Sequence, residues 1–64
     1  MSWKQPLLDC LYLVKEAYSK LVEAFSAYQS QNIALDEKHA KMFAEINKLL
    51  TDAEELIARL CLEG

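Results

Sequence analysis

Two stretches decide the fold: LLDCLYLVKEAYSKLVEAFSAY, residues 7–28, and MFAEINKLLTDAEELIARL, residues 42–60. In both, apolar side chains recur in alternating steps of four and three residues, which is the heptad pattern of helices that pack against other helices. The pattern crosses the middle of the chain without a change of phase. Its members are Leu7, Leu11, Val14, Tyr18, Leu21, Phe25, Tyr28, Asn32, Leu35, His39, Met42, Ile46, Leu49, Ala53, Leu56 and Leu60.

Length and composition indicate how such a chain becomes stable. It has 64 residues, 53% of them hydrophobic, with one Gly and one Pro, a composition that argues against disorder and against a loop-rich disulfide fold. A domain this small buries a modest share of its surface and usually needs disulfides, a metal or oligomerisation. The two cysteines, Cys10 and Cys61, form no framework or metal-binding cluster. We therefore expect free, buried thiols and an oligomer.

Polar residues between about 29 and 38 divide the heptad pattern into two helices. Asn32 or Asp36 can cap the second helix, since short polar side chains accept hydrogen bonds from the first backbone amides. We expect an all-α antiparallel helical hairpin, with helices at about 3–30 and 36–62, forming a single domain over residues 1–64.

The start of the first helix carries its own signals. Ser2 followed by Gln5 has the form of a capping box, in which each side chain bonds the other residue's backbone amide. Pro6 suits the first turn, where its missing N–H costs little. The first helix is therefore predicted to begin between Ser2 and Pro6.

An unbroken heptad phase also fits an alternative, a single long helix in a parallel two-stranded coiled coil. Two features favour the hairpin. Apolar residues extend beyond the width of a two-stranded seam in both halves, which suits a bundle. Folding near residues 31–33 also gives two helices of matched length, each ~38 Å, and would oppose Leu21 to Met42 and Tyr18 to Ile46. Two such hairpins are expected to pair into a four-helix bundle.

The expected homodimer interface consists of the apolar positions of both helices. These are Leu7, Leu11, Val14, Tyr18, Leu21, Phe25, Met42, Phe43, Ile46, Leu49, Leu50, Leu56, Ile57 and Leu60.

A second candidate surface lies at the beginning of the chain, where apolar residues surround the first helix almost completely. A helix that is apolar on all sides is normally covered on all sides, either by self-association or by another protein. The candidate partner-binding patch consists of Trp3, Leu8, Tyr12, Leu13, Cys61 and Leu62.

Several classes of function lack support in the sequence. A net charge of −3 argues against nucleic acid or an anionic membrane as partner, because both attract basic surfaces. There is no catalytic triad, phosphate loop or metal-ligand spacing, and His39 is the only histidine, so we expect no enzyme activity, cofactor or metal. Without a signal peptide or an apolar run of ~20 residues, a cytoplasmic protein that does not enter membranes is expected.

The function predicted from these observations is a non-enzymatic protein–protein interaction module, a small adaptor or regulator that acts as a homo-oligomer, most simply a dimer. In length and expected architecture the chain resembles the plasmid-copy-control RNA-binding hairpins that dimerise into four-helix bundles. That resemblance is one of architecture, without a shared residue motif. It implies the alternative function, a small RNA-binding regulator built as a dimeric four-helix bundle.

Overall fold

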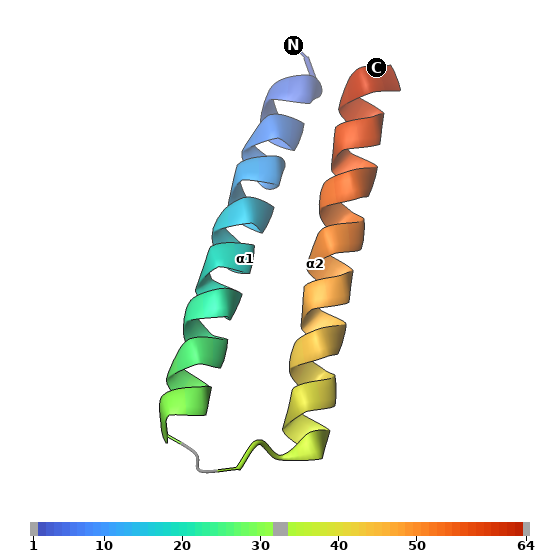
Figure 1. The fold of residues 1–64 in the computed structure, drawn as a ribbon. Helices are drawn as coiled ribbons and strands as arrows, with labels where there is room; N and C mark the ends of the chain where they lie inside the picture. The colour runs from blue at the N-terminus through green and yellow to red at the C-terminus, as the bar shows by residue number, and fades with distance from the viewer. Residues whose placement is uncertain (1, 32–33, 64) are drawn as a thin grey trace.

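The computed structural model describes residues 2–31 and 34–63 and contains two helices, α1 (Lys4–Gln31) and α2 (Glu37–Glu63). They lie side by side and antiparallel, so that both ends of the chain are at the same end of the molecule (Figure 1). Their lengths, 28 and 27 residues, are well matched. The predicted all-α hairpin is confirmed, and the alternative of one continuous rod does not describe this structure.

The beginning of α1 uses the predicted serine cap. The Ser2 hydroxyl oxygen accepts a hydrogen bond from the Lys4 backbone N–H at 3.1 Å. The Gln5 amide, which was expected to complete the capping box, instead donates to the Asp9 carboxylate one turn later, at 3.2 Å. Helix α1 therefore begins within the predicted interval.

The beginning of α2 is capped by Asp36, as the sequence predicted. Its carboxylate accepts a hydrogen bond from the Lys38 backbone N–H at 2.9 Å, and its carbonyl accepts the first helical bond from Ala40 N–H at 2.8 Å. Glu37 adds a negative charge in the first turn, where the helix dipole favours it. Asn32, the other predicted cap, lies outside the described residues.

Aromatic rings join the two helices near the connection. The Phe25 and Phe43 ring centroids are 5.1 Å apart with an interplanar angle of 72°, and those of Tyr28 and Phe43 are 5.5 Å apart. These are edge-to-face arrangements, which add to the free energy gained from burying the rings. The Tyr28 hydroxyl also makes a 2.7 Å hydrogen bond with Nδ1 of His39. Helix pairing is thus anchored close to the turn.

The faces that meet are half-buried on both helices. On α1 they follow the predicted heptad pattern. On α2 most of the half-buried residues come one position after that pattern, and the exceptions are Ala53, which belongs to the pattern, and Ala58. The half-buried residues on the α1 face are Leu7, Leu11, Val14, Leu21, Phe25 and Tyr28, and those on the α2 face include Ala40, Phe43, Leu50, Ile57 and Cys61.

The register of the hairpin differs from the expected pairing of Leu21 with Met42. Phe25, which that register would have opposed to His39, packs on Phe43, four residues later. Helix α1 ends at Gln31 and α2 begins at Glu37, which centres the connection on residue 34 rather than on 31–33. This shift of the connection along the chain moves every facing residue of α2 by about one turn and changes which side of α2 meets α1.

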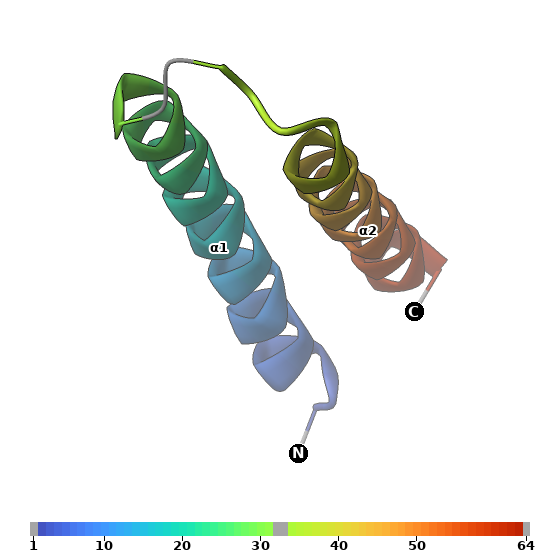
Figure 2. The same ribbon diagram turned by 90° about the horizontal axis from the view of Figure 1, so that it is seen from below.

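The molecule is a flat pair of helices, as the views in Figures 1 and 2 show. It measures 51 × 16 × 12 Å, and its radius of gyration of 15.0 Å exceeds the ~10.7 Å typical of a compact domain of this length. None of the described residues 2–31 and 34–63 is fully buried. Both thiols are free, but Cys10 is exposed and Cys61 only half-buried, so the expectation of buried cysteines was wrong.

Replacement of Phe43 by Ala should destabilise the hairpin. The change removes a ring that contacts both Phe25 and Tyr28, and for a half-buried ring we expect a loss of about 1.5–3 kcal/mol. Urea unfolding followed by circular dichroism at a fixed protein concentration measures this. Leu62→Ala, at an 87% exposed position of the same helix, is the control and should shift the midpoint little. Equal effects of the two changes would contradict the aromatic anchor.

Removal of the α2 cap should cost about 1 kcal/mol. Asp36→Ala deletes the acceptor of the Lys38 N–H, whereas Asp36→Asn keeps an acceptor oxygen in the same place. The unfolding free energies of both variants test the cap directly. If the Asn variant is as unstable as the Ala variant, the hydrogen bond is not the source of the effect.

Candidate interaction surface

A second row of large apolar side chains runs along α2, beside the face that meets α1. Its five large members are between 45% and 61% exposed, and Ala53 completes the alternating four-three spacing. We call this row the α2 stripe. It consists of Met42, Ile46, Leu49, Ala53, Leu56 and Leu60.

The angle between the stripe and α1 follows from helix geometry. Consecutive helical residues point about 100° apart. Met42 precedes Phe43, Leu49 precedes Leu50, Leu56 precedes Ile57 and Leu60 precedes Cys61. Because the second residue of each pair belongs to the half-buried face, the stripe lies about a quarter turn away from α1.

The predicted oligomer interface is therefore divided by the structure into two sets. One set is half-buried along the contact between the helices: Leu7, Leu11, Val14, Leu21, Phe25, Phe43, Leu50 and Ile57. The other set is exposed: Tyr18, Met42, Ile46, Leu49, Leu56 and Leu60. Apart from Tyr18, every member of the exposed set belongs to the α2 stripe.

A signal for this division is present in the sequence. Apolar doublets recur at seven-residue intervals, as Met42–Phe43, Leu49–Leu50 and Leu56–Ile57. A helix that packs on one side needs only one apolar residue at each of these points in the sequence. Two consecutive apolar residues point in different directions, so the doublets indicate two adjoining apolar faces. The heptad pattern alone does not tell which residue of each doublet meets the partner helix in the same chain.

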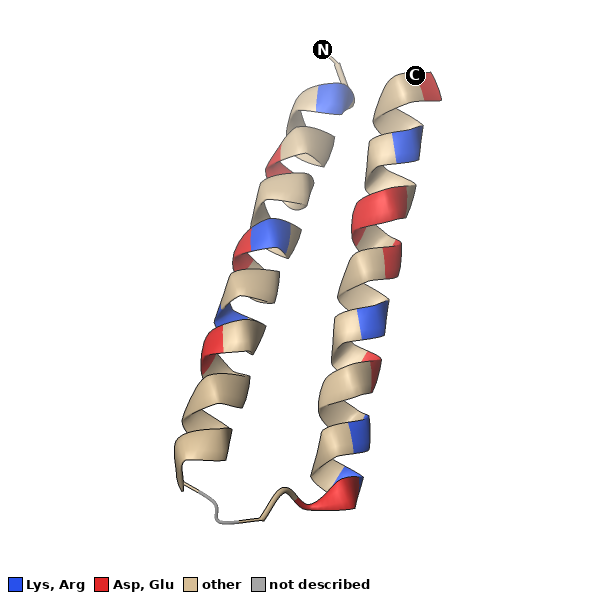
Figure 3. Cartoon of the chain, viewed as in Figure 1, with Lys and Arg blue, Asp and Glu red and all other residues tan. Residues whose placement is uncertain are grey.

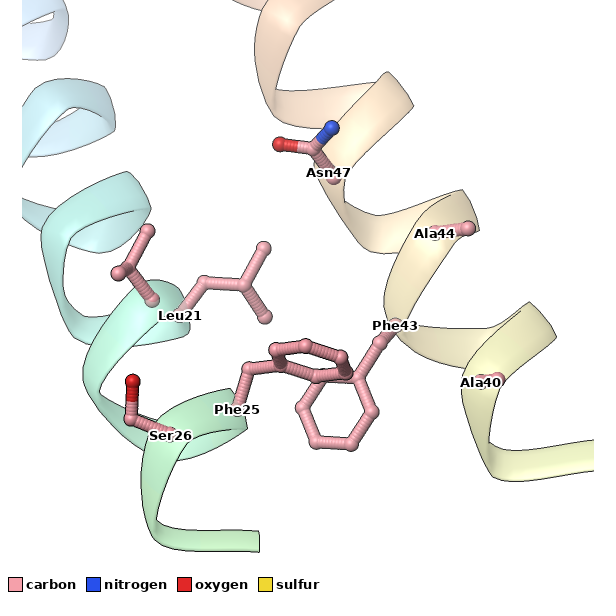
Figure 4. A pocket seen from close by; sticks show the side chains of 8 residues that line it. Leu21, Phe25, Ser26, Ala40, Phe43, Ala44 and Asn47 are labelled. Atoms are coloured by element: carbon pink, nitrogen blue, oxygen red, sulfur yellow. The ribbon is translucent and has the colours of Figure 1, made fainter. Parts of the chain in front are cut away.

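Two shallow grooves lie between the helices on the other side of the hairpin. Lys15 lines one groove and Val22 lines the other. These two residues are seven positions apart and therefore lie on the same face of α1, so both grooves open on the same side. Ala44, which lines the groove in Figure 4, is two residues from Ile46 and thus points almost oppositely. The groove in Figure 4 is bordered by Leu21, Val22, Phe25, Ser26, Ala40, Phe43, Ala44 and Asn47. The small side chains of Ala40 and Ala44 leave this side open.

The predicted partner-binding patch gathers at the end of the hairpin that holds both termini, but it does not form one face. Tyr12 and Leu13 are 77% and 65% exposed and, as neighbours in a helix, point about 100° apart. Trp3, Leu8 and Leu62 are also exposed, while Cys61 belongs to the half-buried face of α2. These residues therefore surround the end of the hairpin.

Charged side chains are spread along both helices, with basic and acidic residues interleaved (Figure 3). Among the described residues, three ion pairs form within single helices: Lys20–Glu23 at 3.4 Å, Glu37–Lys41 at 3.6 Å and Glu55–Arg59 at 3.2 Å. Their side chains are more than 60% exposed, so each pair contributes little to stability. The charges are available for contacts with a partner.

Among residues 2–31 and 34–63 there is no group of three or more His, Cys, Asp or Glu side chains placed to hold a metal ion. Neither described helix carries an apolar segment long enough to cross a membrane. The α2 stripe is thus the most extensive feature that chemistry marks for an interaction.

Comparisons with protein-family models, with curated protein sequences and with solved structures each gave no match.

Proposed function

We propose that this chain is a non-enzymatic protein–protein interaction module that works as a homo-oligomer, with a second copy covering the α2 stripe. Two hairpins joined in this way form a four-helix bundle, the arrangement in which short amphipathic hairpins bury both of their apolar faces. The observation that carries the proposal is the row of large, regularly spaced and exposed side chains from Met42 to Leu60.

The exposed area supports a partner of this kind. The chain has 5312 Å² of accessible surface, against about 4,200 Å² for a compact monomer of 7.3 kDa. The excess of roughly 1,100 Å² is of the size that one partner buries in a stable protein–protein interface, about 800 Å². A second copy would remove this excess without any other component.

The spacing of the stripe favours a helix as the surface that covers it. Alternating steps of four and three residues form the seam that receives side chains of another helix between its own. The side chains of a sheet or an extended peptide alternate with a period of two residues, which does not match steps of four and three. Because the stripe is itself such a seam, the same stripe of a second copy is a matching surface.

A bundle of this kind suits a small adaptor or regulator. Dimerisation presents two copies of every exposed surface, including the end of the hairpin with Trp3, Tyr12 and Leu13. Through avidity, paired copies bind a repeated or dimeric target more tightly than one copy does. As part of the same proposal, we place the protein in the cytoplasm. Its two cysteines form no disulfide framework, and the cytoplasm is a compartment that keeps thiols reduced.

The experiment is a charge placed in the stripe. Leu49→Glu introduces a carboxylate at a side chain that is 60% exposed in the single hairpin, so the helices should still form. In the dimer the same carboxylate would be buried without a partner, and we expect the dissociation constant to rise at least ~100-fold. Sedimentation equilibrium over a range of concentrations measures it, with circular dichroism to verify helicity.

Tyr12→Glu is the matched control, because Tyr12 is still more exposed and lies on α1 away from the stripe. This variant should remain a dimer. A wild-type protein that stays monomeric at millimolar concentration would refute the proposal, as would a Leu49→Glu variant that dimerises as tightly as the wild type.

A further inference from the structure

The two edges of the α2 stripe differ in chemistry. Phe43, Leu50 and Ile57 each follow a stripe residue and belong to the half-buried face that meets α1, so this border is an apolar edge. Glu45, Asp52 and Arg59 each precede a stripe residue and, in a heptad, border the opposite side. All three are exposed, and we call this border the charged edge.

From this asymmetry we infer that α2 pairs with α2 of the second copy in antiparallel orientation, with Glu45 of each copy against Arg59 of the other. The inference rests on the proposed function, because it specifies how the second copy covers the stripe. It identifies Glu45 and Arg59 as the residues that select register and partner.

Antiparallel pairing brings like edges together. In an antiparallel pair of heptad helices the residues on a given edge meet the same edge of the partner, whereas in a parallel pair each edge meets the opposite one. A parallel dimer would place Glu45 near Leu50 and Asp52 near Ile57, so that carboxylates would lie beside apolar side chains that already pack toward α1. The antiparallel dimer avoids this loss of solvation.

The apolar contact and the charges together choose among the antiparallel registers. The register that uses the whole stripe pairs Met42 with Leu60, Ile46 with Leu56 and Leu49 with Ala53 of the second copy. It sets Glu45 opposite Arg59 twice, and Asp52 opposite Asp52 once at the two-fold axis. Two attractive contacts therefore accompany one repulsive contact.

A shift by one heptad gives a worse arrangement. It would set Glu45 opposite Asp52 twice and Lys38 opposite Arg59 twice, which makes only repulsive contacts along the charged edge. A shift in the other direction would set Asp52 opposite Arg59 twice, but it would leave Met42 and Ile46 with no stripe residue opposite them. The full register therefore has the largest apolar contact, and its charged contacts are attractive overall.

The charged edge is free to make these contacts in the single hairpin. Within residues 2–31 and 34–63, the Glu45 side chain takes part in no hydrogen bond or ion pair of its own chain. Arg59 contacts Glu55 at 3.2 Å through one terminal nitrogen. A guanidinium carries five N–H donors, so a second carboxylate can be bound at the same time.

A charge-swap experiment tests the pairing. Glu45→Lys alone creates two Lys–Arg repulsions in its homodimer, and Arg59→Glu alone creates two Glu–Glu repulsions. A mixed dimer of the two variants restores attraction at both contacts. We expect each homodimer to bind ~10-fold more weakly than the wild type, and the mixed dimer to bind about as tightly as the wild type.

Native mass spectrometry of the mixture, with one variant isotopically labelled, counts the mixed and unmixed dimers. At low salt the mixed dimer should predominate, and near 1 M NaCl the preference should shrink because salt screens exposed charges. Glu16→Lys mixed with Lys20→Glu, on the outward side of α1, is the matched control and should mix at random. Random mixing of the α2 variants would overturn the inferred register.

Spin labels measure the orientation separately. In a background with Cys10 and Cys61 changed to Ser, Lys41→Cys and Lys48→Cys each carry one label. The antiparallel register separates the two labels along the axis by ~30 Å at position 41 and by ~9 Å at position 48. A parallel pair would place both label pairs at equal heights, so similar short distances at the two positions overturn the inference.

Failure of the pairing is distinguishable from failure of the proposed function. A dimer that mixes at random, or has similar label distances at both positions, leaves the homo-oligomer in place with another geometry. A wild-type protein that remains monomeric removes both.

Discussion

Two helices that lie side by side can cover only one side of each other, and this constraint governs the whole molecule. In a hairpin 12 Å thick, every residue is near solvent, and none of the described residues is fully buried. A chain in which 53% of residues are hydrophobic has more apolar surface than one such contact can cover. The surplus has to be placed on one face or another, and its position decides what the protein can bind.

Helix α2 carries most of that surplus in an ordered form. Its apolar doublets form two adjoining faces, one turned to α1 through Phe43, Leu50 and Ile57, and the other open through the α2 stripe. The exposed apolar residues of α1, such as Tyr12 and Leu13, are by contrast spread around the helix. Regular spacing is the property that distinguishes a surface suited to another helix from scattered exposure, which most proteins tolerate.

Much of the fold followed from local sequence. The bounds of both helices lie within about one residue of those expected, because Ser2 and Asp36 are caps whose chemistry acts over a few residues. The pairing of residues across the hairpin was less predictable, since it depends on the position of a connection that has no Gly or Pro to mark its ends. The numbers of two paired residues add up to twice the number at the centre of the turn. Misplacing that centre by two residues therefore shifts the pairing by four residues.

The candidate surface was anticipated only as part of a larger set. The sequence alone determined that the chain forms two amphipathic helices and that their apolar residues exceed the needs of one contact, because periodicity and composition are properties of the chain itself. Which residue of each doublet meets α1 was decided by the tertiary structure. Edge-to-face packing of Phe43 on Phe25 and Tyr28 turns α2 so that its second apolar row remains in solvent.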